Sequence, residues 1–273
     1  MSNPCGKHHI VRELCRKLCR ELCRNPKMTF NHEKLNVYQQ ALSFNKKTCN
    51  WVVEWDNRHA ICDHLDRAAS SILENIAMAS ATVSANKIRY LDYAIGSSLE
   101  CAACLDIAAI KGLLTGESAS KEKTDLSGLL RMTIGLRRSW LAPQAREERE
   151  NYGVSNDIIF HHERLDVYRL TLHLLNSVFS SEDVKQLPCT TFRRLDELCT
   201  SIALNIAEGN GRFSKLDQSK FIEISHCSAI KVAAKLDLCL ARNMIQEDEV
   251  KEWKGMIERI ASMTSARFNE TYT

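Results

Sequence analysis

Apolar residues recur at helical spacing through most of the chain. In the C-terminal half, four stretches place them three or four residues apart, which is the period of one face of an α-helix. The four stripes are Leu165, Tyr168, Leu172 and Leu175; Phe192, Leu195, Leu198, Ile202 and Ile206; Phe221, Ile224, Ser228, Val232 and Leu236; and Val250, Trp253, Ile257 and Ile260. None of these segments contains an internal proline, so nothing interrupts the helices. The pattern predicts four amphipathic helices in this half.

The chain contains the same unit twice. Residues 30–38 return as residues 160–168, and the string Ser-Ile-x-x-Asn-Ile-Ala at residues 71–77 returns at 201–207, both with an offset of 130. Further matches at an offset of 131 pair Ser97, Ala103, Leu105 and Asp106 with Ser228, Ala234, Leu236 and Asp237. Self-similarity at a fixed offset indicates a tandem duplication. We therefore predict an all-α protein of two antiparallel four-helix bundles, residues 30–141 and 159–273, joined by a charged linker over residues 142–158.

Residues at the predicted helix ends support the prediction of four helices in each copy. Gly112 and Asn243 occupy matching positions in the two copies, and Gly and Asn best tolerate the left-handed conformation that ends many helices. Ser214, three residues before Asp217, resembles the N-cap of a new helix. Gly209 and Gly211 are expected to end the second helix of the second copy.

Charge is concentrated in residues 1–29, which carry seven Lys or Arg and two Glu, whereas the whole chain carries 37 basic and 34 acidic residues. A Leu-Cys pair recurs every four residues along this segment, at 14–15, 18–19 and 22–23, which predicts a helical arm with one apolar stripe and one basic face. The basic face would lie along RNA phosphates through Arg12, Arg16, Lys17, Arg20 and Arg24. Alternatively, the stripe docks on a bundle or a partner helix, or the arm is simply solvated.

Twelve cysteines suggest a disulfide framework only at first sight. The N-terminus has no apolar signal-peptide core, so we expect a reducing, cytoplasmic location and cysteines that pack as small hydrophobes. No long uncharged apolar run predicts a membrane span. Cys15, Cys19 and Cys23 lie four residues apart, which leaves open a thiol-based metal-binding bundle; their spacing matches no zinc-finger pattern, and we expect no metal or cofactor.

The string Asn-Ile-Ala-Glu-Gly-x-Gly-Arg at residues 205–212, with Phe221 and the Ser228-Ala229 segment after it, resembles the bacterial four helix bundle protein family. That family includes proteins encoded in intervening sequences of large-subunit ribosomal RNA genes and relatives of the accessory variability determinant of diversity-generating retroelements. The resemblance covers about 110 residues in each copy. It implies a small non-enzymatic bundle, often assembled as a homo-oligomeric ring, that binds structured RNA or partners a reverse transcriptase. A tandem chain departs from the single-copy members of the family.

The two copies have diverged in their family motifs. The first keeps Asn75, Gly96, Ser97 and Glu100 but lacks the Glu-Gly-x-Gly-Arg string, whereas the second keeps Asn205, Glu208, Gly209, Gly211, Arg212 and Ser228 and has Lys231 where the first has Glu100. We hypothesise that the two halves meet between the bundles. Alternatively, Glu208 and Arg212 form a local ion pair that shapes a turn, Asn205 bonds the backbone of a neighbouring helix, and Ser97 and Ser228 allow close helix approach.

Motifs for catalysis are missing from the sequence. There is no P-loop and no nucleophile elbow, and a single Glu-x-x-His element, Glu223 and His226, cannot supply a di-iron site. His32 and His162 are interpreted as helix-capping residues. We therefore expect a binding protein rather than an enzyme. The family resemblance implies that it is bacterial and that its partner is structured RNA or a reverse-transcriptase ribonucleoprotein, with Arg212 and Lys215 joining the arm in phosphate contacts. The alternatives are a protein-interaction scaffold without nucleic acid and a thiol-based metal binder.

Overall fold

Each copy folds into four long helices that follow one another along the chain. The computed structural model describes residues 30–56, 58–82, 86–141 and 160–272, with side chains up to residue 266. The first copy comprises η1 (Asn31–Lys34), α2 (Asn36–Glu54), α3 (Ile61–Ala81), α4 (Asn86–Ile110) and α5 (Gly116–Trp140). The second comprises η2 (His161–Arg164), α7 (Asp166–Ser180), the one-turn α8 (Glu182–Lys185), α9 (Cys189–Asn210), α10 (Lys215–Ala241) and α11 (Glu247–Tyr272).

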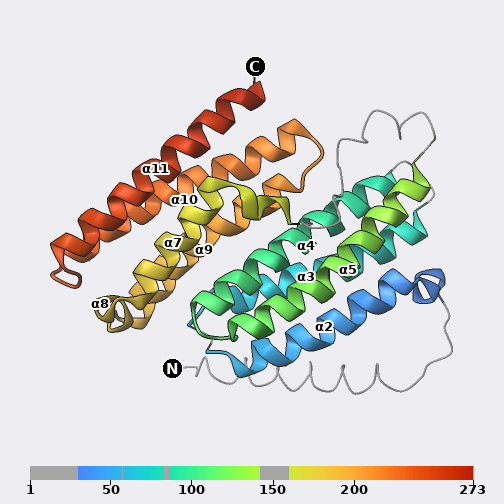
Figure 1. Cartoon of the computed structure of the whole chain (residues 1–273), viewed down its shortest axis with the longest axis horizontal. Coiled ribbons are helices and arrows are strands. Elements are labelled where there is room, and N and C mark those ends of the chain that lie inside the picture. Colours follow the sequence, from blue (N-terminus) through green and yellow to red (C-terminus); the bar gives the residue numbers. More distant parts are fainter. Residues whose placement is uncertain (1–29, 57, 83–85, 142–159, 273) are drawn as a thin grey trace, which may run out of the picture.

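The helices form two bundles that lie side by side (Figure 1). Within each bundle, consecutive long helices pack against each other, and the first also contacts the fourth. Every regular element in the described residues is a helix, so the predicted all-α class is confirmed. The predicted basic arm and the linker lie outside the described residues.

The helix ends follow the predicted chemistry. Gly112 has φ +69° and Asn243 has φ +52°, the left-handed conformation expected at both positions. The amide of Leu113 donates to the carbonyl of Ala108 at 2.9 Å, and Met244 makes the equivalent bond in the second copy, so both helices end in the same capping motif. The hydroxyl of Ser214 accepts from the amide of Asp217 at 3.4 Å and opens α10, as predicted.

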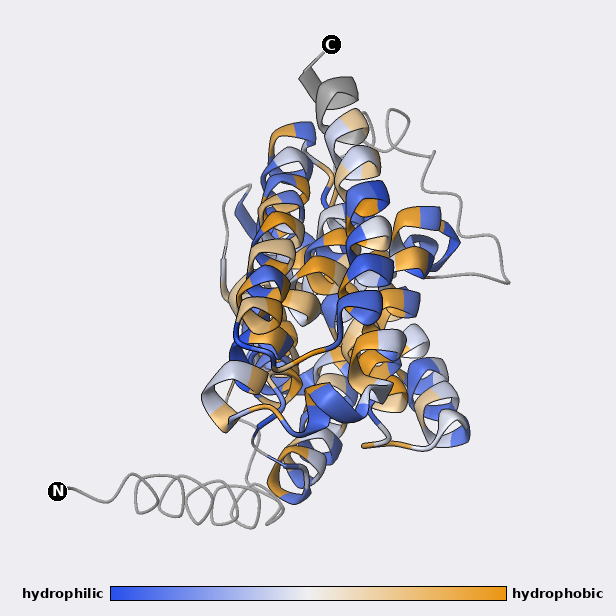
Figure 2. Ribbon diagram, turned by 90° about the vertical axis from the view of Figure 1, so that its left-hand side faces the viewer, coloured by the Kyte–Doolittle hydropathy of each residue, from blue (hydrophilic) through white to orange (hydrophobic). Residues whose placement is uncertain are grey.

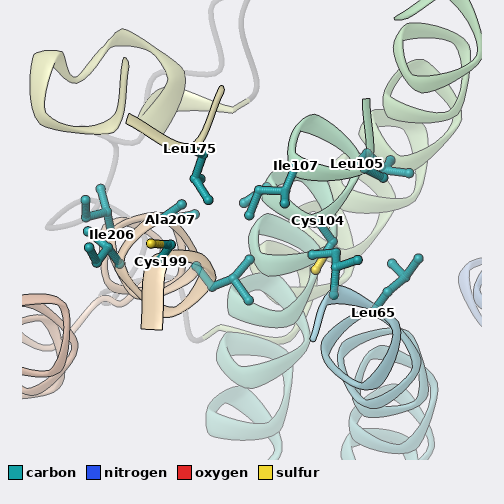
Figure 3. Packing of buried hydrophobic residues seen from close by; sticks show 14 of the residues in the cluster. Leu65, Cys104, Leu105, Ile107, Leu175, Cys199, Ile206 and Ala207 are labelled. Carbon is teal, nitrogen blue, oxygen red and sulfur yellow. The ribbon is translucent and has the colours of Figure 1, made fainter. Parts of the chain in front are cut away.

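Helix α4 lies at the centre of the molecule. It contacts α3 and α5 of its own bundle and α7 and α9 of the other. Figure 3 shows Cys104 of α4 directed towards Leu65 of α3, and Ile107 of α4 directed towards Leu175 of α7. By length and composition, α4 would also pass as a membrane-spanning helix, but most of its apolar stretch is buried inside the protein. A helix that is covered both by its own bundle and by the other one is apolar nearly all round, as α4 is.

The other helices alternate between hydrophilic and hydrophobic bands (Figure 2), and their buried stripes largely match the prediction. Two expectations are wrong in detail. Ile224, assigned to a buried stripe, is 46% exposed on α10. Gly209 lies inside α9, and only Gly211 stands at its end.

We predict that Gly112→Ala destabilises the protein by about 1 kcal/mol, because its positive φ disfavours any side chain. No neighbouring atom would touch the new methyl group, so the cost is conformational. Gly128→Ala is the matched control, since Gly128 is exposed inside α5 with equally open space, and there Ala should stabilise by about 0.5–1 kcal/mol. Urea denaturation measures both; equal effects of the same sign would contradict the prediction.

Candidate functional site

Motif residues from both copies surround one pocket at the junction of the bundles. The pocket has a volume of about 320 Å³ and is formed by α3, α4 and the end of α9. Its lining residues are Arg67, Ala68, Ser71, Asn75, Tyr93, Ser97, Glu100, Glu208 and Arg212. The structure therefore brings the Gly-Ser-x-x-Glu half of the first copy against the Glu-Gly-x-Gly-Arg half of the second.

Arg212 is the side chain that crosses from one copy to the other. It is 8% exposed, and it donates to the carboxylate of Glu208 one turn earlier. Its guanidinium lies 5.2 Å from the ring centre of Tyr93 and 4.8 Å from that of Phe221. A Cβ at Gly96 would come within 3.0 Å of the guanidinium carbon. Gly96 thus leaves space on α4 for the arginine of the other copy.

The carboxylates of this pocket lie close to each other. Burial and the negative charge of Glu100 raise the pKa of Glu208 above its usual value, and the ion pair with Arg212 offsets only part of that rise. Glu100 in turn lies 3.4 Å from the Nδ1 atom of His64. The local ion pair between Glu208 and Arg212 therefore forms as expected. It also faces the first bundle, so it contributes to the contact between the two copies.

The two motif asparagines bind their own helices. Asn75 Nδ2 donates to the carbonyl of Ser71 at 2.7 Å, and the Ser71 hydroxyl is 2.8 Å from that of Ser97 on the next helix. Asn205, Ser201 and Ser228 repeat this arrangement in the second copy. The expected bond from Asn205 to a neighbouring helix backbone is wrong: the serine pairs join the helices, and each asparagine holds its serine in place.

Close packing, and not an unusual backbone conformation, explains the two motif glycines. A Cβ at Gly209 would lie 2.9 Å from the Cβ of Phe221, and one at Gly211 would lie 2.3 Å from Leu99 Cδ1 of the first copy. Both distances are shorter than carbon atoms tolerate. The string Glu-Gly-x-Gly-Arg therefore forms a flat contact surface for α10 and α4.

A buried ion pair that the sequence analysis missed lies at the opposite end of α4. Lys111 from the first copy contacts Asp196 from α9, and both side chains are fully buried. The amide of Ala60 donates to Asp196 at 2.8 Å, and Thr200 lies within 3.3 Å of the ammonium. Burial would raise the pKa of Asp196, but its hydrogen bonds and the charge of Lys111 hold that pKa below the usual value. In the sequence, the only signal for this ion pair is that the charged residue Asp196 lies beside the apolar stripe of α9.

A third contact between the copies gathers Asp106, Lys123, Glu163 and Tyr168. The Lys123 ammonium lies 2.6 Å from Asp106 and 2.5 Å from Glu163, and the Tyr168 hydroxyl donates to Asp106 at 2.9 Å. Asp106, Glu163 and His162 are spaced closely enough to ligate a metal ion. Lys123 already supplies the positive charge between the carboxylates, so the arrangement fits an ion-pair network better than a metal site.

His162 belongs to this region and is not the capping residue that we expected. It is completely buried, its ring lies 4.7 Å from that of Tyr168, and neither ring nitrogen has a hydrogen-bond partner. Burial, with the positive charge of Lys123, lowers its pKa to about 3. The equivalent His32 stacks on Phe30 near the start of the first copy.

A family model described as 23S rRNA-intervening sequence protein matches residues 33–135 and again residues 163–266. The two matched regions contain both halves of the junction described above. The chain belongs to the 23S rRNA-intervening sequence protein family. Comparison with curated proteins and with solved structures found no match for this family member.

Two of the predicted phosphate-binding residues of this family member, Arg212 and Lys215, lie in the described part of the chain. Arg212 is buried in the junction and engaged by Glu208, whereas Lys215 is exposed in the first turn of α10. The arm residues Arg12 to Arg24 lie outside the described residues. Among the described cysteines, burial raises the pKa of Cys62 to about 11 and that of Cys101 well above its usual value, so these thiols remain protonated.

We predict that Asp196→Asn destabilises the protein by about 3–5 kcal/mol, because it leaves the Lys111 charge buried without a counter-charge. The double variant Lys111→Met/Asp196→Leu should recover most of that loss. Urea denaturation at pH 7 measures both. Glu182→Gln, which removes an exposed ion pair with Lys185, is the control and should change stability by less than about 1 kcal/mol. A mild effect of Asp196→Asn would show that the pair is not buried in solution.

We also predict that His162 makes the fold sensitive to mild acid. Its pKa is lower in the folded chain than in the unfolded chain, so its stability contribution is complete above pH 6.5 and declines as the pH falls towards 3. At about 1.4 kcal/mol per pH unit, stability should fall by about 2 kcal/mol from pH 7 to pH 5. His162→Leu should reduce this difference in urea unfolding, and the equivalent control His32→Leu should leave it unchanged.

Proposed function

We propose that this family member is a non-enzymatic protein that binds structured RNA. The observation that carries the proposal is the concentration of positive charge in residues 1–29, seven basic against two acidic residues. Binding to phosphates depends on such clustered charge. The family name, which refers to an intervening sequence of 23S rRNA, supports the same class of partner. A ribonucleoprotein that contains a reverse transcriptase is the finer form of the proposal.

In this proposal the junction pocket holds the two bundles together and has no catalytic role. Several of its charged and polar side chains pair with one another: Arg212 with Glu208, Asn75 with Ser71, and Ser71 with Ser97. Groups held in this way stabilise an arrangement of helices. A catalytic acid or base, in contrast, needs a free position facing its substrate.

In this proposal the bundles contribute little to phosphate affinity. Arg137 is buried and paired with Asp92, and Lys111 and Arg212 are buried as well. These three cations thus hold the protein together. The rest of the chain, residues 30–273, carries 30 basic and 32 acidic residues, so the arm is the principal source of attraction for a polyanion in this proposal.

We predict that the full-length protein, purified under reducing conditions at low salt, retains RNA that ribonuclease removes. Replacing Arg12, Arg16, Arg20 and Arg24 with Gln should weaken binding of a structured RNA and reduce the slope of log K against log salt by about 3, since each phosphate contact contributes about 0.7–0.9. The matched control replaces the same four residues with Lys, which keeps the charge and should keep most of the slope.

Two outcomes would contradict the proposal. Wild-type protein that is free of nucleic acid and does not bind RNA at low salt would exclude it. Equal salt slopes for the wild type and the Gln variant would show that the arm is not the binding element.

A protein-interaction scaffold is the second candidate function. It is favoured by large apolar side chains exposed on α10, among them Ile224, Ile230 and Leu238. Monomeric soluble proteins rarely expose contiguous apolar patches without a partner.

A further inference from the structure

The junction pocket contains charged groups that the packing of the helices does not require. Both copies join their second and third long helices by the same serine pair and asparagine. At the junction this arrangement is surrounded by four further side chains, Tyr93, Glu100, Glu208 and Arg212. The repeat has different residues at these four positions, namely Ile224, Lys231, Met78 and Thr82. Because the second copy packs its helices without the charged set, packing alone does not explain that set at the junction.

Arg212 brings hydrogen-bond donors without acceptors to the wall of this pocket. The residue is 8% exposed, and it donates to one oxygen of Glu208. Its Nε and Nη1 atoms are buried too, and no residue in the described part of the chain accepts a hydrogen bond from either. A buried charged donor without an acceptor costs free energy. In a pocket wall, such a donor therefore indicates an acceptor on a bound molecule.

Hydrogen-bond acceptors outnumber these donors around the pocket. The carboxylate of Glu100 is partly exposed and lies 3.4 Å from the Nδ1 atom of His64. Arg212 binds the Oε1 atom of Glu208, which leaves Oε2 to accept another bond, and Asn75 donates through Nδ2 to its own helix, which leaves its Oδ1 atom. Burial and the charge of Glu100 raise the pKa of Glu208, so one arginine does not neutralise both carboxylates. A ligand that complements this pocket offers more donors than acceptors.

Guanine has the hydrogen-bonding edge that matches this arrangement. Its O6 atom accepts, and the adjacent N1–H and N2 amino groups donate, so two donors stand beside one acceptor. Adenine and cytosine each offer one amino donor beside acceptors, and uracil offers one donor between two carbonyl oxygens. The pocket volume of about 320 Å³ lies at the lower end of the range for small-molecule sites, about 300–1,000 Å³. That volume suits a single base.

We propose that the junction pocket binds one unpaired guanine of an RNA, with O6 on Arg212 and the two donors on Glu100 and Glu208. The proposal rests on RNA binding as the proposed function and adds base specificity to it. Proteins that read RNA sequence bind unpaired bases in this way, through the Watson–Crick edge. Arg67, an exposed residue of the pocket lining, provides a planar guanidinium on which the base stacks. The arm supplies phosphate contacts, and the pocket selects the base.

The site requires both copies. Glu100 and Asn75 come from the first copy, whereas Glu208 and Arg212 come from the second. In the second copy, Lys231 stands at the position of Glu100, and its positive charge would repel the donor edge of guanine. The duplication therefore creates a site that neither copy carries by itself.

The test compares the four nucleoside 5′-monophosphates in binding to the full-length protein at high salt, by ligand-detected NMR. All four carry the same sugar and phosphate, so a difference between them reports the base. We expect guanosine monophosphate to bind at least about 10-fold more tightly than the other three. Inosine monophosphate, which lacks the N2 amino group, and N1-methylguanosine monophosphate should each bind about 10-fold more weakly than guanosine monophosphate. Equal binding of the four nucleotides, or no binding of guanosine monophosphate at its highest soluble concentration, would overturn the proposal.

A conservative variant locates the site. Glu100→Gln keeps the shape of the side chain but removes its charge, and it should abolish the preference for guanosine monophosphate. Glu74→Gln is the matched control, because Glu74 is an exposed glutamate of α3 outside the pocket lining, and this variant should keep the preference. Circular dichroism and urea unfolding check that both variants fold, and the nucleotide analogues test the wild type without any variant. A preference that persists in folded Glu100→Gln protein would overturn the proposal.

The arm variant separates this proposal from the proposed function. Replacing Arg12, Arg16, Arg20 and Arg24 with Gln should weaken RNA binding but leave the preference for guanosine monophosphate unchanged. Glu100→Gln should keep the salt dependence of RNA binding but lose the distinction between hairpins with guanine and with adenine in the loop. A preference that disappears with the arm charges would overturn the pocket as its source. Wild-type protein that prefers guanosine monophosphate but binds no RNA would overturn RNA as the source of the guanine.

Discussion

The buried ion pair between Lys111 and Asp196 is the constraint on which the arrangement of the two bundles depends. Both charges are removed from water, and an ion in a protein interior is tolerated only when its partner and further hydrogen bonds are precisely placed. The amide of Ala60 and the hydroxyl of Thr200 complete this site. The pair therefore fixes the end of α4 against α9 in one register, and apolar side chains next to it, such as the fully buried Ile107, add hydrophobic stabilisation.

Duplication explains why the junction has one direction. In a chain of two similar bundles, each copy contains both kinds of surface. At the junction, the first copy contributes its third long helix, α4, and the second copy contributes its second long helix, α9. Divergence has followed that division: Gly96 stayed where Arg212 must fit, and Gly211 stayed where Leu99 must fit.

The sequence by itself determined the helices, because helical periodicity, left-handed capping at Gly112 and Asn243 and the repeat offset are local or self-referential signals. It also indicated the two motif halves from their complementary losses. It did not determine which apolar stripe faces the other copy, so Ile224 was assigned to a core and His162 to a cap. Only the tertiary structure decided those positions, together with the pairing of Lys111 with Asp196, because burial and charge pairing between residues 85 positions apart depend on how bundles pack and leave no periodic signal along the chain.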